Sequence, residues 1–168
     1  NKEKKVFIID FDSTITKVEG LDELAAIALA NTPNGEAIVK KIKDLTDRGM
    51  SGELSFSDAL RERLALLNAN KKHVAQLVEF LKSNITQSFE RNRKFLAEFS
   101  DQIIVVSSGF KDFILPIVEH LGMNPENVYA NTFIYDEAGN IVGIDEDNVL
   151  TQTGGKIKLL ESLDLDAH

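Results

Sequence analysis

The sequence contains no cysteine among its 168 residues. Disulfide scaffolds, thiolate metal sites and cysteine nucleophiles are therefore excluded, and we expect a protein of the reducing cytoplasm. No apolar run approaches the roughly 20 residues that span a membrane. Basic residues are few, with 19 Lys and Arg against 27 Asp and Glu, a formal net charge of −8 and a pI near 4.9. Duplex nucleic acid and anionic membranes bind basic surfaces, so neither is an expected partner.

Two short apolar runs predict the central strands of the fold. With 43% hydrophobic and 27% charged residues, the composition is that of a globular protein. Residues 6–9 and 103–106 are rich in β-branched side chains, which predicts strands buried on both faces of a parallel sheet. The small polar residues Asp10 and Ser107 follow the two runs directly. Ligands bind parallel α/β sheets at such strand ends.

The segment between these strands is too long for a simple connection. Apolar residues recur at helical spacing over residues 16–85, whereas a crossover between neighbouring parallel strands needs about a dozen residues or slightly more. We therefore predict an inserted helical cap over 16–85 and a core formed by 1–15 and 86–168. In the core we expect a crossover helix over 88–99, further helices over 112–121 and 156–163, a strand over 128–130 and a hairpin over 132–144.

The sharpest motif is Asp10-Phe11-Asp12-Ser13-Thr14, directly after the first strand. Two carboxylates two residues apart in extended backbone point to the same side. One can attack an electrophile, while the other protonates the leaving group and then takes a proton from water. Asp10, next to the strand, is the predicted nucleophile, and Asp12 is the predicted acid and base. The alternative is an acidic turn that caps the next helix.

Two further motifs predict an anion site. Ser107, Ser108 and Gly109 follow the second strand, where a hydroxyl and the free amides of a helix N-terminus would bind an anion. An ordinary helix cap is the alternative. Lys156 follows two glycines, and its compact charge suits an aspartate and a phosphate at once. The alternative here is a solvated surface lysine.

The order of these features, strand–DxDxT, helical insert, strand–SSGF and Gly-Gly-Lys, resembles the haloacid dehalogenase superfamily of aspartate-nucleophile phosphatases. The resemblance is close to the phosphoserine phosphatase branch and covers nearly the whole chain. It implies an α/β fold with a Rossmann-like parallel-sheet core and an inserted helical cap. It also implies a nucleophile at Asp10 and an acid/base at Asp12. The implied phosphate-binding residues are Ser107, Ser108, Gly109 and Lys156, with Ser108 in place of a family glycine.

The cap segment carries the residues that the same resemblance assigns to substrate recognition. Glu19 stands where the family places a glutamate near the substrate's amino group, and Met50, Phe56 and Arg63 match its recognition stretch. A glutamate and a bidentate arginine complement the ammonium and carboxylate of phosphoserine. The alternatives are a solvated helix face for Arg63 and cap core for Met50 and Phe56.

One family motif has no match. In the family, a Gly-Asp-Gly-x-x-Asp turn after a fourth strand helps to hold Mg²⁺, whereas this sequence ends with Asp164 and Asp166 in a D-x-D pattern. The resemblance implies a Mg²⁺ cofactor, for which Asp10 and the carbonyl of Asp12 remain as ligands. Without the family's fourth strand, the first strand would lose a neighbour and become an exposed apolar edge. We therefore expect the chain to be a fragment of a longer phosphatase.

The expected activity is Mg²⁺-dependent hydrolysis of O-phospho-L-serine, a step of serine biosynthesis, through an aspartyl phosphate. Two alternatives stay open at this point. One is a related capped phosphatase with another small phosphomonoester as its substrate, and the other is a non-catalytic ligand-binding fragment. The sequence sets no oligomeric state.

Overall fold

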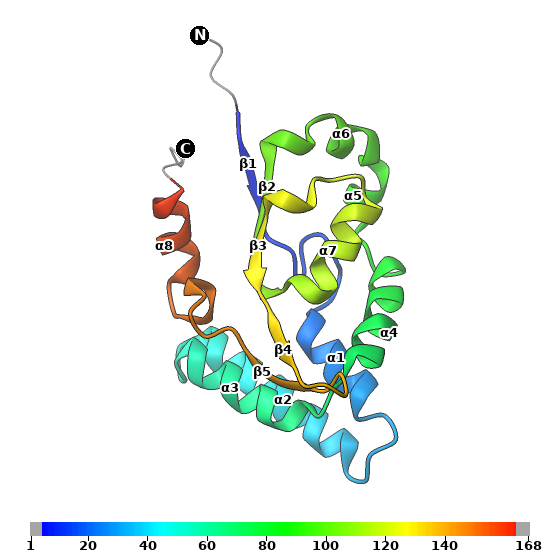
Figure 1. Ribbon diagram of the computed structural model, residues 1–168, viewed down its shortest axis with the longest axis vertical. Coiled ribbons are helices and arrows are strands. Elements are labelled where there is room, and N and C mark those ends of the chain that lie inside the picture. The colour runs from blue at the N-terminus through cyan, green and yellow to red at the C-terminus, as the bar shows by residue number, and fades with distance from the viewer. Residues whose placement is uncertain (1–4, 164–168) are drawn as a thin grey trace.

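Three parallel strands form the central sheet of the computed structural model, which describes residues 5–163. Their order is β1-β2-β3, with β1 at Phe7–Ile9, β2 at Ile103–Phe110 and β3 at Val128–Asn131 (Figure 1). Phe7 lies opposite Ile103 in the register of β1 and β2. The apolar runs thus place their strands side by side with the same polarity, and the predicted α/β fold class is confirmed.

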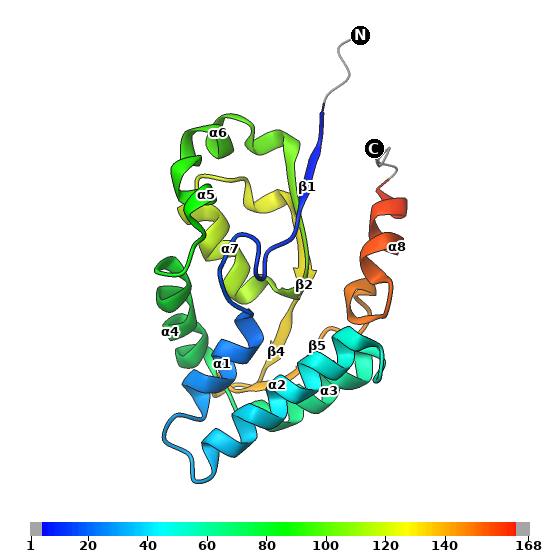
Figure 2. The same ribbon diagram turned by 180° about the vertical axis from the view of Figure 1, so that it is seen from behind.

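Helices cover both faces of this sheet. On one side lie α5 (Gln87–Arg91), α6 (Arg93–Glu98) and α7 (Lys111–His120), and on the other lies α8 (Gly155–Ser162) (Figures 1 and 2). The face toward α7 is filled by apolar side chains that are fully buried, namely Phe11, Phe110, Phe113, Ile114 and Ile117. This packing fixes the carboxyl ends of β1 and β2 against one rigid layer.

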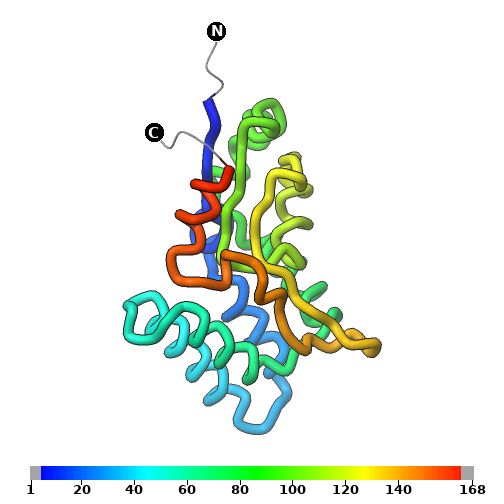
Figure 3. The backbone as a smooth tube through the Cα atoms, turned by 60° about the vertical axis from the view of Figure 1, so that its left-hand side comes forward, coloured from blue at the N-terminus to red at the C-terminus, as the bar shows by residue number. Residues whose placement is uncertain are grey.

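Four helices follow β1 and form a helical insert at the carboxyl ends of the strands (Figure 3). They are α1 (Gly20–Ala28), α2 (Gly35–Ser51), α3 (Phe56–Leu67) and α4 (Lys71–Lys82). The two ends of the insert meet, because Thr16 and Ile85 form an isolated antiparallel bridge and the Thr86 amide donates to the Ile15 carbonyl at 2.9 Å. Between residues 5 and 163, no helix has the length and apolar character needed to cross a membrane.

A β-hairpin connects β3 to the last helix. Its antiparallel strands are β4 (Phe133–Tyr135) and β5 (Ile141–Ile144), and its turn reaches the start of α4, where the Lys71 amide donates to the Gly139 carbonyl at 2.9 Å. Asp112 of α7 accepts from the Phe133 amide and the Tyr135 hydroxyl. Three single turns of 3₁₀ helix complete the described chain, at Ser100–Gln102, Pro125–Asn127 and Val149–Thr151.

The apolar run of β1 by itself predicts burial on both faces, whereas the missing family strand beside it predicts an exposed apolar edge, and the structure shows the exposed edge. Val6, Phe7 and Ile8 are 41%, 39% and 38% exposed. The cause is that, among residues 5–163, β1 lies at the edge of the sheet and pairs with β2 alone. The apolar character of this strand is therefore not matched by burial within residues 5–163.

Two predicted element boundaries also differ from the structure. The expected crossover helix over 88–99 is divided into α5 and α6 at Asn92, whose side chain donates to the Ser88 carbonyl at 2.7 Å. Such a local side-chain bond competes with the helical pattern. Strand β2 continues to Phe110, with a register irregularity between Val106 and Phe110. The serine motif thus belongs to the end of β2 and not to the loop after it.

Candidate active site

The ends of β1 and β2, the start of α8 and the helical insert surround one cleft of about 300 Å³. Nine of the ten site residues predicted from the sequence line it: Asp10, Asp12, Glu19, Met50, Phe56, Arg63, Ser108, Gly109 and Lys156. The tenth, Ser107, is fully buried beside the cleft, within hydrogen-bond reach of Asp12. The structure therefore brings the predicted residues together from four separate parts of the chain.

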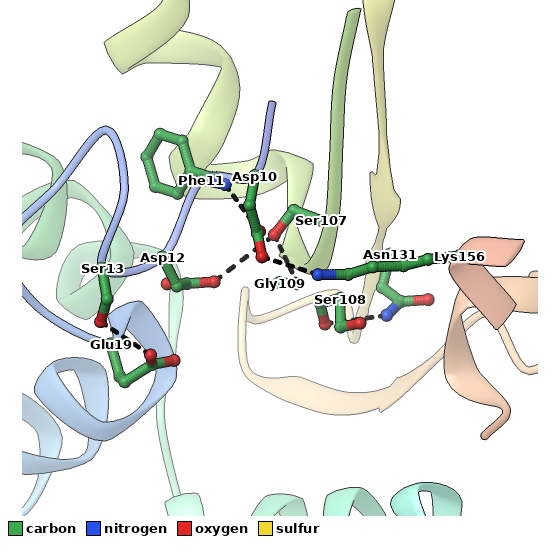
Figure 4. Close-up of polar contacts among 10 residues, drawn as sticks. All are labelled: Asp10, Phe11, Asp12, Ser13, Glu19, Ser107, Ser108, Gly109, Asn131 and Lys156. Carbon is green, nitrogen blue, oxygen red and sulfur yellow. Dashed lines mark hydrogen bonds and ion pairs between the residues drawn. The ribbon is translucent and has the colours of Figure 1, made fainter. Parts of the chain in front are cut away.

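Asp10 stands at the end of β1 and faces Lys156 (Figure 4). The Asp10 Oδ2 and Lys156 Nζ atoms are 2.7 Å apart, and the Phe11 amide donates to Asp10 Oδ1 at 2.7 Å. Helix α8 begins at Gly155, and a Cβ at this residue would lie 2.1 Å from the carbonyl oxygen of Val149. Glycine therefore allows the start of α8 to pack against this segment, which places Lys156 beside Asp10. A solvated surface lysine, the alternative for Lys156, does not describe this ion pair.

Asp12 points into the cleft from the turn after β1 and is tied to α1. Its Oδ1 accepts from the Gly20 amide at 2.7 Å, and the Ser107 hydroxyl lies 3.4 Å from its Oδ2. Burial raises the pKa of the Asp12 carboxyl to about 7, and the negative charges of Glu19 and Asp10 add to the effect of burial. The amide of Gly20 and the hydroxyl of Ser107 act in the opposite direction. An acid with this pKa can both give and take a proton near neutral pH.

The serine motif at the end of β2 lies next to Asp12. The Gly109 amide donates to the Ser107 hydroxyl at 2.9 Å. A Cβ at Gly109 would lie 2.8 Å from Asp12 Oδ2, so only glycine allows this approach. The helix-cap alternative for Ser107 is wrong, because α7 begins at Lys111 and has no side-chain cap.

Sequence reasoning missed Asn131, the last residue of β3. Its side chain is fully buried, and its Nδ2 donates to the Ser108 carbonyl at 3.0 Å (Figure 4). The same Nδ2 also donates to the Leu150 carbonyl at 3.3 Å. Asn131 thus joins the serine motif to the segment that leads to α8. A signal was available, because a polar residue at the end of a third parallel strand follows the same rule as Asp10 and Ser107.

The insert contributes one acidic and one basic group to the cleft. Glu19 precedes α1, and its Oε1 accepts from the Ser13 hydroxyl at 2.8 Å. Arg63 of α3 is only 9% exposed, so it does not lie on a solvated helix face. Its Nη1 donates to the Thr46 hydroxyl at 3.0 Å, while its Nε is buried without a hydrogen-bond partner among the described residues. Asp22 and Thr46, which support this arginine, were also missed.

The two apolar residues of the recognition stretch lie at the rim of the cleft. Met50, near the end of α2, is 72% exposed, and the cap-core alternative is therefore wrong for this residue. Phe56 begins α3 and is half-buried, and its amide donates to the Thr153 hydroxyl at 3.2 Å. This last contact joins the insert to the segment that carries Lys156.

The donor set for a metal ion is small. Within residues 5–163, no three or more His, Asp or Glu side chains converge as metal ligands. Asp10 and Asp12 both line the cleft. Mg²⁺ usually keeps several waters and takes one or two carboxylates plus a substrate phosphate, so these two residues fit an ion that shares the cleft with a phosphate. Asp164 and Asp166 lie outside the described residues.

Comparisons with known proteins give a consistent result. No family model matches the chain. The chain is 30% identical over 159 residues to the phosphoserine phosphatase of Homo sapiens, an alignment that covers 95% of this chain and 67% of that protein. It is 29% identical over 154 residues to the chloroplastic phosphoserine phosphatase of Arabidopsis thaliana, covering 92% of this chain and 50% of that one. The chain thus spans half to two thirds of the length of these curated relatives.

Solved structures show the same likeness. A phosphoserine phosphohydrolase-like protein from Francisella tularensis matches with a TM-score of 0.81 and 25% identity, over 98% of this chain and 75% of that chain. A phosphoserine phosphatase described as a phospho-aspartyl intermediate analogue matches with a TM-score of 0.75 and 28% identity, over 96% and 71% of the two chains. The protein therefore belongs to the phosphoserine phosphatase branch of the haloacid dehalogenase superfamily.

Proposed function

We propose that this chain carries the catalytic groups of a phosphatase that hydrolyses O-phospho-L-serine to serine and phosphate. The observation that carries the proposal is the convergence of Asp10, Asp12 and Lys156 on one cleft, with Asp10 and Lys156 in contact at 2.7 Å. A carboxylate, a second carboxyl of suitable pKa and a cation are the groups that phosphoryl transfer through an aspartyl phosphate requires. The relatives that match the chain support the same chemistry.

The reaction has two steps in this proposal. A carboxylate oxygen of Asp10 attacks phosphorus, the bond from phosphorus to the serine oxygen breaks, and Asp12 gives that oxygen its proton. Asp12 then takes a proton from water, which attacks phosphorus and releases Asp10 and inorganic phosphate. The pKa of Asp12 near 7 supports both roles, because the carboxyl must hold a proton in the first step and lose it before the second.

The phosphoryl oxygens would lie between Lys156 and the serine motif of Ser107, Ser108 and Gly109. Lys156 offsets the negative charge that gathers when a phosphate approaches Asp10, and the serine motif offers polar groups at the end of β2. Asp10 and the carbonyl of Asp12 would hold a Mg²⁺ ion, which supplies further charge stabilisation when bound. Both residues are within the cleft that must receive the phosphate.

The insert side of the cleft would bind the amino-acid part of the substrate. Glu19 suits the ammonium group and Arg63 the carboxylate. Arg63 supports this assignment, because it is buried and forms no ion pair within 4.0 Å among residues 5–163. A buried cation needs an anionic partner, and the substrate's carboxylate would supply it. Met50 and Phe56 would close over the bound substrate and exclude water.

The division of the chain follows from these roles. We infer that the helical insert, predicted over residues 16–85, is a cap over the active site, and that residues 1–15 and 86–168 belong to the catalytic core. The Thr16–Ile85 bridge supports this division, because it closes the insert at its base. A serine-producing reaction would place the protein in serine biosynthesis, and the absence of cysteine is compatible with the cytoplasm.

Phosphate release from O-phospho-L-serine in the presence of Mg²⁺ tests the proposal, with Asp10→Asn as the control. We expect turnover by the wild type, its loss in Asp10→Asn and its loss when a chelator removes divalent cations. Rapid acid quenching followed by peptide mass measurement should place a phosphoryl group on Asp10. Turnover that survives in Asp10→Asn, or a phosphoryl group on another residue, would contradict the proposed mechanism.

A further inference from the structure

A buried network of three hydrogen-bonded side chains joins three helices of the insert behind the cleft. Arg63 Nη1 of α3 donates to Thr46 Oγ1 of α2 at 3.0 Å, and that hydroxyl lies 2.8 Å from Asp22 Oδ1 of α1. The three residues are only 9%, 7% and 8% exposed. Arg63 and Thr46 line the cleft, whereas Asp22 does not. Asp22 therefore supports the other two from behind.

The arginine fixes the direction of the hydrogen bonds in this network. A guanidinium can only donate hydrogen bonds, so the Thr46 oxygen must accept the one from Arg63. The single hydroxyl proton of Thr46 is then directed to another acceptor. The two candidates are Asp22 Oδ1 at 2.8 Å and the Ile42 carbonyl at 3.1 Å. The carboxylate is the stronger acceptor, because bonds to ionised groups are shorter and stronger.

The hydroxyl between the two charges leaves most of the guanidinium available. Within residues 5–163, Nη1 is the only nitrogen of Arg63 with a hydrogen bond, and no carboxylate lies within 4.0 Å of it. A direct pair with Asp22 would occupy the fork that binds a carboxylate in a bidentate manner. Thr46 instead fixes one corner of the guanidinium, and the long side chain loses rotational freedom before the ligand arrives.

We propose that Thr46, supported by Asp22, is a positioning residue that holds Arg63 in the orientation that binds the substrate's carboxylate. This inference rests on the proposed function and deepens it, because it locates specificity for an amino-acid phosphate in a hydroxyl that need not touch the substrate. Removal of the hydroxyl should weaken recognition of the carboxylate and leave the phosphoryl chemistry at Asp10 and Asp12 intact.

The test compares two substrates that differ only in the carboxylate, O-phospho-L-serine and O-phosphoethanolamine. Thr46→Val removes the hydroxyl at nearly constant volume, and Thr46→Ser retains it. In the full chain with Mg²⁺, we expect Thr46→Val to raise the KM for phosphoserine about 10-fold, the equivalent of one hydrogen bond to a charged group. Its kcat should stay within about 3-fold, the KM for phosphoethanolamine should be unchanged, and Thr46→Ser should restore the KM for phosphoserine.

A second variant keeps the test decisive if Thr46→Val does not fold, which thermal unfolding would reveal. Asp22→Asn retains an acceptor for the Thr46 hydroxyl but removes the charge, so we expect a smaller rise in the KM for phosphoserine alone. Arg61→Ala is the matched control on α3, because Arg61 is exposed and pairs with Asp58 and Glu146. This control should preserve the preference for phosphoserine.

The outcomes separate this inference from the proposed function. If Arg63→Ala removes the preference for phosphoserine while both Thr46→Val and Asp22→Asn retain it, the proposed function stands and the positioning role is wrong. Equal losses on both substrates would also overturn the positioning role. If the wild type shows no preference and Arg63→Ala has no effect, head-group recognition fails, and the positioning role fails with it.

Discussion

Replacement of Asp12 by asparagine should stabilise the protein at neutral and alkaline pH, although it removes the proposed acid and base. Burial is the main reason that the pKa of Asp12 rises from an ordinary 3.8 to about 7. Each pKa unit corresponds to about 1.4 kcal/mol, so the ionised carboxylate costs the folded state up to about 4 kcal/mol. Since water and local relaxation reduce such penalties, we expect a gain of roughly 2 kcal/mol for Asp12→Asn at pH 8.

The sign of the pH dependence follows from the raised pKa of Asp12. Below about pH 4 the carboxyl is protonated in the folded and unfolded states, so Asp12 and asparagine are nearly equivalent. Between pH 4 and 7 the unfolded chain loses this proton while the folded protein keeps it, and the stability of the wild type falls. The advantage of Asp12→Asn should therefore grow over this interval and stay constant above it.

Urea unfolding of the wild type and Asp12→Asn at pH 4, 6 and 8, in a chelator, measures this difference. Asp136→Asn is a control for which the change of stability with pH should have the opposite sign. Hydrogen bonds from Asn140 lower the pKa of the exposed Asp136, so its stabilising effect is present above the ordinary aspartate pKa and is lost as the pH falls. The reasoning is refuted if Asp12→Asn is no more stable than the wild type at pH 8, or if its gain does not depend on pH.

Three further predictions concern the same site. Lys156→Met should lower phosphate release by at least about 100-fold. It should change Tm by less than about 4 °C, because the side chains of Lys156 and Asp10 are 40% and 44% exposed and such ion pairs contribute about 1 kcal/mol or less. A large fall in Tm would contradict this prediction. Gly109→Ala should lower kcat by about 10- to 100-fold, since its Cβ would lie 2.8 Å from Asp12 Oδ2 and displace it; steady-state kinetics with an unchanged kcat would exclude such a displacement. Gly20→Ala should destabilise the fold by about 1–3 kcal/mol in urea unfolding, because its Cβ would lie 2.5 Å from the ring of buried Phe113; wild-type stability would show that the ring can move freely.

The sequence predicts those parts of the site that follow local rules. Asp10 and Asp12 could be placed at a strand end because an apolar run precedes them, and the sheet confirms where that strand lies. The approach of Lys156 to Asp10 was expected only from the family resemblance, since no periodicity relates residues 146 positions apart. The exposure of β1 was likewise expected only from the family strand that has no match here, because an apolar run does not reveal whether its strand has one neighbour or two.

The residues that sequence reasoning missed are polar and buried. Asn131, Thr46 and Asp22 each bond to a partner on another element, and only Asn131, at the end of a strand, had a local signal. A threonine within a helix looks like an ordinary surface residue until packing brings an arginine to it. Such cross-element hydrogen bonds depend on the tertiary arrangement of α1, α2 and α3, which the pattern of apolar residues indicates only coarsely.

The separation of Asp10 and Lys156 in the sequence also sets the order in which parts of the site form during synthesis on the ribosome. The two residues are 146 positions apart, so at about 5–20 residues per second the cation is made roughly 7–30 s after the nucleophile. Strand β2, which pairs with β1, is complete at Phe110, well before α8 begins. We therefore expect β1, β2 and the insert to be synthesised before Lys156 completes the phosphate-binding site, so that a nascent chain that has not yet reached Lys156 cannot turn over substrate.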